Sequence, residues 1–292
     1  MADKKRLIVI DSNSIIHRAF HALPPLTTKK GEVVGAVYGF LLVLFKALKE
    51  FQPDFVVAAF DVSGPTFRHE KYKDYKAKRP KAPEELYQQI PKVKEILKSL
   101  DVKIFEKQGF EADDIIGTIA KLAPKKQVIP GIETIILSGD SDTLQLIDAH
   151  TKTYALRKGV KDTVLYDKKM VEEKYQGLTP KQLIDFKALK GDPTDNIPGV
   201  PGIGEKTAIG LIKEFGTLEN LYQNLDDVKL KTKEILIQNK EQAFFSRDLV
   251  EINKAVPLDF NLKECQWGDY DKEKATQTLK SFDFYSLISR LP

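Results

Sequence analysis

The chain has 292 residues, 42% of them hydrophobic and 30% charged, so it is too rich in core-forming side chains to be a disordered protein. Its single cysteine, Cys265, excludes an internal disulfide and a cysteine metal site, which agrees with a cytoplasmic location. The net charge of +4 does not by itself argue for nucleic acid, and we find neither a signal peptide nor the run of about 20 apolar residues that a membrane helix needs.

Short apolar runs alternate with helical patterns through the first 178 residues. Runs of this length, separated by helical periods, are typical of buried parallel strands. Strands are expected at Leu7–Asp11, Phe55–Asp61 and Thr134–Gly139 and, more weakly, at Lys103–Phe105 and Lys152–Leu156. Helices are expected at Ala36–Phe51, Pro83–Leu100, Ala112–Leu122 and Asp142–Ile147. The alternation predicts an α/β fold with a mostly parallel central sheet flanked by helices.

After about residue 178 the strand-like runs end and the patterns become helical. Helices are expected at Pro180–Lys190, Glu205–Phe215, Thr217–Asn224 and Lys231–Leu249. We therefore predict an α/β domain over residues 1–178 and a second, helical region over residues 179–292. The segment Pro124–Glu133 is loosely patterned and is expected to be a loop.

Residues 64–81 concentrate positive charge, with seven lysines and arginines against two acids. Phe67, Tyr72 and Tyr75 are interleaved with the basic residues. A basic stretch with interleaved aromatic residues suits contact with phosphates and stacking on bases. Taken alone, however, a charge run of this kind is more often only solvated surface.

Carboxylates occur where predicted strands end, at Asp11, Asp61 and Asp140. The carboxyl ends of parallel strands form the ligand-binding edge of an open α/β sheet. Further acids lie beside them in loops or at predicted helix starts: Glu111, Asp113, Asp114, Asp142, Asp192 and Asp195. Nine anions in one cleft repel each other unless cations hold them, and oxygen ligands suit Mg²⁺ or Mn²⁺. Any one aspartate could instead be a turn former or a helix cap.

The Gly/Pro-rich segment Gly199–Ala208 lies between two predicted helices. Its glycines permit close backbone approach, and the helix that follows presents free N–H groups to an anion. This is the form of a helix–hairpin–helix element, to which Lys206 and Thr207 could add contacts. It does not match the nucleotide-binding loop G-x-x-x-x-G-K-[ST], because Glu205 separates Gly204 from Lys206. A plain tight turn is the alternative.

Taken together, these motifs resemble the 5′-nuclease domain of bacterial DNA polymerase I, within the flap endonuclease family. The motifs that carry the resemblance are Ile10–Ser14, Ala59–Asp61, Phe67–Glu70 with Tyr75–Ala77 and Arg79, Glu111–Ile115, Ser138–Asp142 and Lys190–Ala208. They follow the family's order over nearly the whole chain.

The resemblance implies a PIN-like fold and a structure-specific 5′ nuclease, acting as a 5′→3′ exonuclease and 5′-flap endonuclease in primer removal and repair. It implies two or more Mg²⁺ or Mn²⁺ ions. The metal ligands would be Asp11, Asp61, Glu111, Asp113, Asp114, Asp140, Asp142, Asp192 and Asp195. The resemblance also implies catalytic roles for basic residues, either at the phosphate that is cut or in a basic arch over residues 64–90. These residues would be Arg18, Arg68, Lys76 and Arg79.

The resemblance also implies how DNA is held. A helix–hairpin–helix element over residues 181–215 would grip the duplex, with K⁺ on its backbone carbonyls. The DNA-binding residues would be Tyr75, Gly199, Val200, Gly202, Ile203, Gly204, Lys206 and Thr207. The implied partners are DNA with 5′ flaps, nicks or 5′ ends, RNA primer strands and covalently linked polymerase domains. The resemblance further implies a monomer that lies in the bacterial cytoplasm and does not bind membranes.

Three alternatives are weaker. A haloacid-dehalogenase-type phosphatase needs a second aspartate two residues after the first, and Asn13 occupies that position. A non-catalytic DNA-binding relative would have lost acids, whereas all nine are present. A related group of standalone flap endonucleases lacks some outer acids, which Asp192 and Asp195 supply here.

Overall fold

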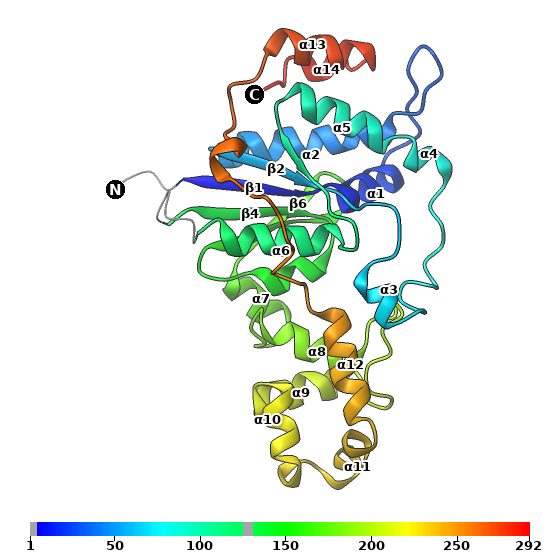
Figure 1. Ribbon diagram of the computed structural model, residues 1–292, viewed down its shortest axis with the longest axis vertical. Coiled ribbons are helices and arrows are strands. Elements are labelled where there is room, and N and C mark those ends of the chain that lie inside the picture. Colours follow the sequence, from blue (N-terminus) through cyan, green and yellow to red (C-terminus); the bar gives the residue numbers. More distant parts are fainter. Residues whose placement is uncertain (1–4, 125–130) are drawn as a thin grey trace.

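The structure is a computed structural model that describes residues 5–124 and 131–292. Residues 125–130 of the loop predicted at Pro124–Glu133 lie outside the described residues. A layered α/β domain carries a helical lobe at one end, and the last part of the chain returns to the α/β domain (Figure 1).

The α/β domain is built on a six-stranded sheet in the order β3-β2-β1-β4-β5-β6. The strands are β1 (Arg6–Asp11), β2 (Phe55–Ala59), β3 (Lys103–Phe105), β4 (Glu133–Ser138), β5 (Thr151–Lys158) and β6 (Asp162–Tyr166). The first five are parallel, and β6 pairs antiparallel with β5. The predicted α/β fold with a mostly parallel sheet is confirmed.

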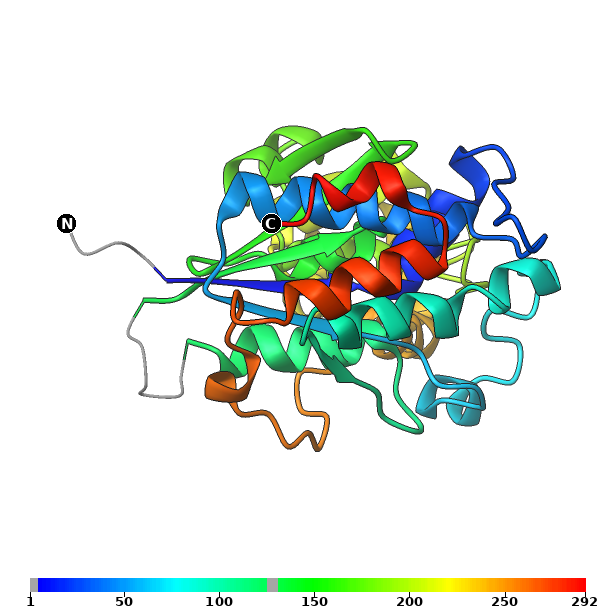
Figure 2. The ribbon, with the colours of Figure 1, turned by 90° about the horizontal axis from the view of Figure 1, so that it is seen from above.

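Helices cover both faces of this sheet, which explains why its central strands are continuously apolar. Ile8 and Ile10 of β1 pack on the side of α1 and α2, whereas Leu7 and Val9 pack on the side of α6. Figure 2 shows α2 and α6 on opposite sides of the sheet. These helices are α1 (Ser12–Ala22), α2 (Gly35–Phe51) and α6 (Ala112–Leu122).

Several predicted elements need correction. The helix α1 was not predicted, nor was the edge strand β6, whose residues are mostly half-buried and lack a continuous apolar run. The single helix predicted at Pro83–Leu100 is divided into two helices, α4 (Glu84–Tyr87) and α5 (Ile90–Ser99). The division occurs because Pro91 has no N–H with which to continue the hydrogen bonding of a helix. The helix predicted at Asp142–Ile147 is a 3₁₀ turn, η1 (Ser141–Leu146).

A further short helix, α3 (Phe67–Lys71), lies in the basic stretch over residues 64–81. The helix α7 (Lys168–Lys174) follows β6 and leads toward the helical lobe.

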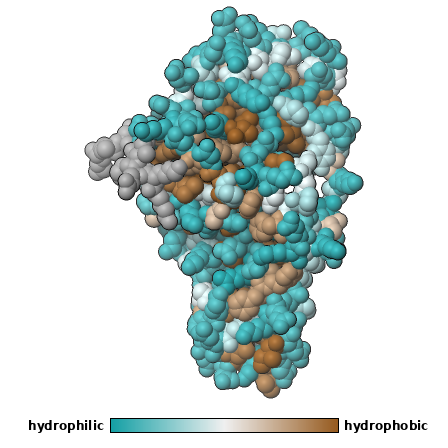
Figure 3. Space-filling view, viewed as in Figure 1, coloured by the Kyte–Doolittle hydropathy of each residue, from teal (hydrophilic) through white to brown (hydrophobic). Residues whose placement is uncertain are grey.

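We define the helical lobe as residues 182–250, which form five helices. These are α8 (Gln182–Lys190), α9 (Glu205–Phe215), α10 (Leu218–Gln223), α11 (Leu230–Gln238) and α12 (Lys240–Val250). The single helix predicted at Lys231–Leu249 is therefore two helices that meet at Asn239. The core of the lobe continues into η1, β6 and α7 through Leu144, Tyr166 and Val171. At the tip, α11 leaves Leu230 and Ile237 exposed, where Figure 3 shows hydrophobic side chains.

The segment after Val250 lies in the second region predicted over 179–292 but packs on the α/β domain instead of the lobe. Gln266 bridges to Phe55 of β2, beyond the 3₁₀ turn η3 (Leu262–Cys265). Two helices, α13 (Lys272–Ser281) and α14 (Tyr285–Ile288), then pack Leu279 and Leu287 into the core that α2 and α5 share. Periodicity cannot distinguish these helices from those of the lobe, because the core that receives them is far away in sequence.

Among the described residues, no helix combines the length and apolar character required to cross a lipid bilayer.

Candidate active site

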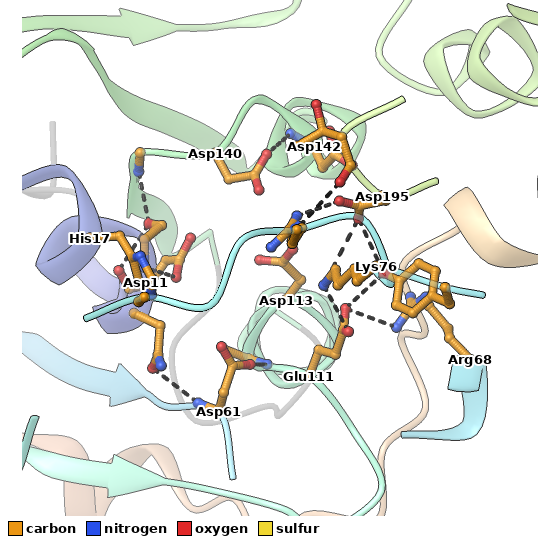
Figure 4. Close-up of a pocket in the computed structure, with 18 of the residues that line it drawn as sticks. Asp11, His17, Asp61, Arg68, Lys76, Glu111, Asp113, Asp140, Asp142 and Asp195 are labelled. Atoms are coloured by element: carbon orange, nitrogen blue, oxygen red, sulfur yellow. Dashed lines mark hydrogen bonds and ion pairs between the residues drawn. The ribbon is translucent and has the colours of Figure 1, made fainter. Parts of the chain in front are cut away.

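A pocket of about 700 Å³ lies at the carboxyl edge of the sheet. Asp11 ends β1 and Asp140 follows β4, the two strands between which the strand order reverses. Ligands of open α/β folds bind at this reversal. Figure 4 shows Asp11, Asp61, Asp113 and Asp140 on one side of the pocket and the joined side chains of Lys76, Glu111 and Asp195 on the other.

The strand-end acids also have the local structural roles that make each of them ambiguous in the sequence. Asp11 caps α1 by accepting a hydrogen bond from the Ser14 N–H at 3.2 Å, and it accepts one from the Ser138 hydroxyl at 2.5 Å. Asp140 caps η1 by accepting a bond from the Asp142 N–H at 2.9 Å. Asp61, two residues beyond β2, accepts a bond from the Ala112 N–H at 2.7 Å. Capping and a place in the pocket are therefore compatible.

Repulsion among the acids changes their proton affinity. Burial raises the pKa of Asp113 well above its usual range, and the nearby carboxylates of Asp11 and Asp140 raise it further. Burial likewise raises the pKa of Asp11 to about 6, against hydrogen bonds from Ser138 and Ser14 that lower it. Burial and the charge of Asp140 raise the pKa of Asp142 to about 6. Added positive charge would relieve this repulsion.

Asp114 differs from its neighbour Asp113, because it is fully buried and does not line the pocket. Both Nη atoms of Arg68 donate to it at 2.8 Å, and the N–H groups of Asn253 and Glu111 donate at 2.8 and 3.1 Å. These four bonds use the acceptor sites of the carboxylate. In this structure Asp114 is a buried partner of Arg68, and its role as a metal ligand stays a prediction.

Arg68 lines the pocket but is only 3% exposed, and its predicted role at the phosphate that is cut stays a prediction. Besides Asp114, it donates to the backbone carbonyls of Leu249 and Glu251, both at 2.9 Å. Its nearest acid on the pocket side is Glu111, at 3.5 Å. Arg68 is therefore a positioning residue that ties α3 and α6 to the end of α12.

The basic stretch enters the pocket through Lys76. Its Nζ donates to Glu111 at 2.8 Å and lies 3.9 Å from Asp195. Its backbone has a φ of +57°, which is unusual for a residue with a side chain, and its N–H donates to the Asp195 carbonyl at 2.9 Å. Arg79 pairs with the Asp195 carboxylate as well. The stretch is thus docked onto the turn that precedes the hairpin.

Lys187 of α8 was not predicted as a site residue. It pairs with Asp142 and donates to Asp192 at 2.8 Å, so it bridges these two acids. Asp192 lines a second, adjoining cavity together with Asp142 and Asp195. No sequence pattern could assign Lys187 to this role, since its partner Asp142 is 45 residues away.

His17 and His21 of α1 also line the pocket and were missed, because α1 was not predicted. Burial lowers the pKa of His17, and the charges of His21 and Arg79 lower it further. Arg18, from the same helix, lines the pocket as predicted and donates to the Gly139 carbonyl at 2.9 Å.

The acids suit a hard divalent cation chemically, although basic side chains lie among them. The predicted metal set offers only carboxylate oxygens, the ligands that Mg²⁺ and Mn²⁺ favour. Within residues 5–124 and 131–292, no group of three or more acidic, histidine or cysteine side chains is arranged to hold an ion. Lys76 and Lys187 bridge pairs of these acids instead. A bound cation would take over the neutralisation that these lysines provide.

The hairpin between α8 and α9 depends on close backbone contact. Gly199 has a φ of +64°, and a Cβ there would lie 2.3 Å from the Gly191 nitrogen, so no larger residue fits. Gly202, Gly204, Lys206 and Thr207 are exposed, and Gly204 precedes the first turn of α9. The predicted DNA contacts of these four residues stay predictions.

Three predicted DNA-binding residues have buried side chains. Val200 and Ile203 are 2% and 4% exposed and belong to the core of the lobe. Tyr75 is 4% exposed, and its hydroxyl donates to Glu111 and Asp195, both at 3.2 Å. Tyr75 nevertheless lines the active-site pocket, and the predicted DNA contacts of these three residues stay predictions. Tyr75 positions the acids and Lys76, whose Nζ lies 4.9 Å from its ring.

Two family models match the chain in sequence. One, described as 5'-3' exonuclease, N-terminal resolvase-like domain, matches residues 6–176. The other, described as 5'-3' exonuclease, C-terminal SAM fold, matches residues 178–273.

The curated relatives include DNA polymerase I of Bacillus subtilis (strain 168), which is 42% identical over 292 residues. That match covers 100% of this chain and 33% of the relative. DNA polymerase I of Chloroflexus aurantiacus is 40% identical, over 98% of this chain and 31% of its own length. The chain therefore spans about a third of the length of these relatives.

Solved structures share the fold at lower identity. The T5 D15 protein co-crystallized with metal ions is 20% identical with a TM-score of 0.71, over 97% of this chain and 100% of that one. The catalytic core of Rad2 in complex with DNA substrate is 19% identical with a TM-score of 0.58, over 99% of this chain and 93% of that one.

Proposed function

Because this chain belongs to the 5′-3′ exonuclease family, we propose that it is a structure-specific 5′ nuclease that hydrolyses DNA phosphodiester bonds near free 5′ ends and at 5′ flaps. The observation that carries the proposal is the gathering of Asp11, Asp61, Asp113 and Asp140 around one pocket at the reversal of strand order. A phosphodiester is an anion, so a pocket of carboxylates can bind one only with the help of cations.

We propose that the acids that face the pocket and the second cavity hold Mg²⁺ or Mn²⁺. The inner ligands would be Asp11, Asp61, Glu111, Asp113 and Asp140, and the outer ligands Asp142, Asp192 and Asp195. When bound, the ions would supply Lewis-acid charge to the phosphate and to the attacking water. The carboxylates would orient the bound groups.

The basic side chains would act on the substrate itself. Lys76 and Arg79 pair with Glu111 and Asp195, so they already lie where a phosphate bound by these acids would sit. Once cations neutralise the acids, these side chains become free to donate to phosphate oxygens and to stabilise charge that develops during cleavage. Arg68 and Tyr75 would keep Glu111 and Lys76 in place.

A single assay tests the proposed function. A labelled 5′-flap DNA, a nicked duplex and a blunt duplex are incubated with the protein in Mg²⁺ or in EDTA. We expect cleavage of the flap and the nick near the 5′ end in Mg²⁺, and none in EDTA. Binding of the flap without cleavage under every metal condition would favour a non-catalytic DNA-binding relative, against which the intact set of acids argues.

Replacing Lys76 with alanine should slow the chemical step by about 10²-fold, because one positioned donor to the developing charge is lost. Binding of the flap should change less than tenfold. Single-turnover rates and equilibrium binding measure the two effects separately. Lys78→Ala, at an exposed lysine of the same stretch, is the matched control and should leave the chemical step unchanged. Equal single-turnover rates for both variants would contradict the proposed role.

The hairpin should hold duplex DNA through its phosphates, so affinity should fall steeply with salt. Replacing the exposed Lys206 with glutamine should reduce the slope of log K against log [salt] by about 1, with little dependence on DNA sequence. Lys213→Gln, in the last turn of the same helix, is the control. Identical slopes for the two variants would argue that the hairpin is an ordinary turn.

The relatives are about three times longer than this chain. We propose that the native protein joins this nuclease to polymerase domains, as the name DNA polymerase I indicates for the relatives. Sequencing of the native reading frame beyond Pro292 would test this directly.

A further inference from the structure

The second cavity, of about 590 Å³, lies between the β5–β6 hairpin and the helical lobe. It shares Asp140, Asp142 and Asp195 with the active-site pocket, so the two cavities adjoin at the acids. Its volume lies within the range of small-ligand sites. Arg157 and Lys174 line it and face no part of the active-site pocket.

Lys174 is an exposed side chain with a fixed position. It is the last residue of α7, and its Nζ lies 4.9 Å from the ring of Tyr166 and 5.3 Å from the ring of Tyr175. Such rings orient an ammonium group without neutralising its charge. No acidic side chain in the described parts of the chain forms an ion pair with it.

Arg157 lies on β5, and within the described residues its one ion pair is with Asp162, at 3.3 Å across the hairpin. Both side chains are largely exposed, at 60% and 41%, so this pair is weak and can open to admit another anion. The carbonyl of Arg157 accepts a bond from Arg18 at 3.4 Å. This contact brings a third cation to the same cavity.

The acids of the cavity do not neutralise these three cations. Lys187 bridges Asp142 and Asp192, and Arg79 pairs with Asp195. The part of the cavity that faces away from the active site is lined by Arg157 and Lys174 and is therefore positive. In the shared part, Asp142 and Asp195 have basic partners, whereas Asp140 caps η1. A lining of arginine and lysine side chains favours the binding of an anion, and these two residue types are the usual partners of phosphate.

We propose that the second cavity is a phosphate subsite, which binds the phosphate next to the one being cut in the same DNA strand. The proposal rests on the proposed nuclease function, because it takes the adjoining acids as the place of cleavage. Holding two successive phosphates would fix the position of the strand across the acids. Arg157 and Lys174 would then be positioning residues that set which bond is cut.

The test measures DNA binding in EDTA, so that it does not depend on cleavage. A 5′-flap DNA carries a single neutral methylphosphonate at one or the other of the two phosphates that flank the cleavage site. For the unaltered protein, we expect one of these two substitutions to weaken binding about tenfold, the effect of one charged hydrogen bond. For the Arg157→Gln/Lys174→Gln variant, we expect binding of unmodified DNA to be about tenfold weaker. The methylphosphonate that weakens binding to the unaltered protein should cause no further loss in this variant.

Lys168→Gln/Lys169→Gln is the matched control, since it removes two exposed charges from α7 outside the cavity. This variant should keep the full methylphosphonate effect. The subsite is excluded if the methylphosphonate weakens DNA binding equally in all three proteins. It is also excluded if neither methylphosphonate weakens DNA binding to the unaltered protein. Cleavage of unmodified flap DNA in Mg²⁺ is measured in parallel, and its absence would contradict the nuclease proposal without affecting the binding result.

Discussion

Replacing Asp113 with asparagine is expected to lower the rate of flap cleavage by about 10³-fold or more and to leave the protein folded. Asp113 faces the pocket beside Asp11 and Asp140, and its charge is already disfavoured there. Removing that charge weakens cation binding, and loss of several kcal/mol of charge stabilisation corresponds to about three orders of magnitude in rate. The same change relieves repulsion in the ion-free protein.

Two measurements check this result. Single-turnover cleavage of a 5′-flap DNA in Mg²⁺ gives the rate, and thermal unfolding with and without Mg²⁺ gives the stability. In EDTA the variant should unfold at the same temperature as the unaltered protein or higher, because a raised pKa means that the charged form is destabilising above that pKa. The stabilisation by Mg²⁺ should shrink in the variant. Near-normal cleavage would remove Asp113 from the metal set.

Replacing Asp114 with asparagine should have the opposite outcome, a loss of stability of about 3–5 kcal/mol, the usual effect of breaking a buried ion pair. Arg68 is 3% exposed, and without the Asp114 carboxylate its charge would stay buried, with two backbone carbonyls and the more distant Glu111, at 3.5 Å, as partners. The N–H groups of Asn253 and Glu111 would also lose the charged acceptor to which they donate. Any loss of cleavage would then follow from unfolding.

Urea unfolding in EDTA measures the effect directly, with Asp113→Asn as the matched control one residue away. The double variant Arg68→Met/Asp114→Leu should recover part of the lost stability, since it removes both charges together. An Asp114→Asn protein with unaltered stability and no cleavage would return Asp114 to the metal ligands and contradict the structural role.

The two aspartates show how far sequence reasoning reaches. The motif Glu111-Ala-Asp-Asp predicts acids at a helix start, and the helix α6 has the predicted bounds. Successive residues of a helix differ by about 100° in direction, so one aspartate faces the pocket and the other faces α3. The sequence could not say which does so, because the answer depends on where Arg68 docks.

The same limit applies to the other differences. Strand ends predicted Asp11 and Asp140 in the pocket, since the sheet alone brings them together. Tyr75 was expected at DNA because it lies among lysines, yet the docking of its stretch against Ile184 and Leu249 buries it. Lys187 pairs with acids through the packing of α8 on the α/β domain, which leaves no local pattern.

The return of the chain after Val250 gives the helical lobe two connections to the α/β domain instead of one. The incoming connection runs from α7 to α8, and the outgoing one borders the active-site pocket at Ile252. A lobe held at two points cannot swing on a single tether, so a pull on DNA bound at its hairpin would be resisted by both connections. A protein cut near residue 178 would also lose Phe260, Leu279 and Leu287 from the packing of the sheet and its helices, so the boundary between the two family models is not a place at which the fold can be divided.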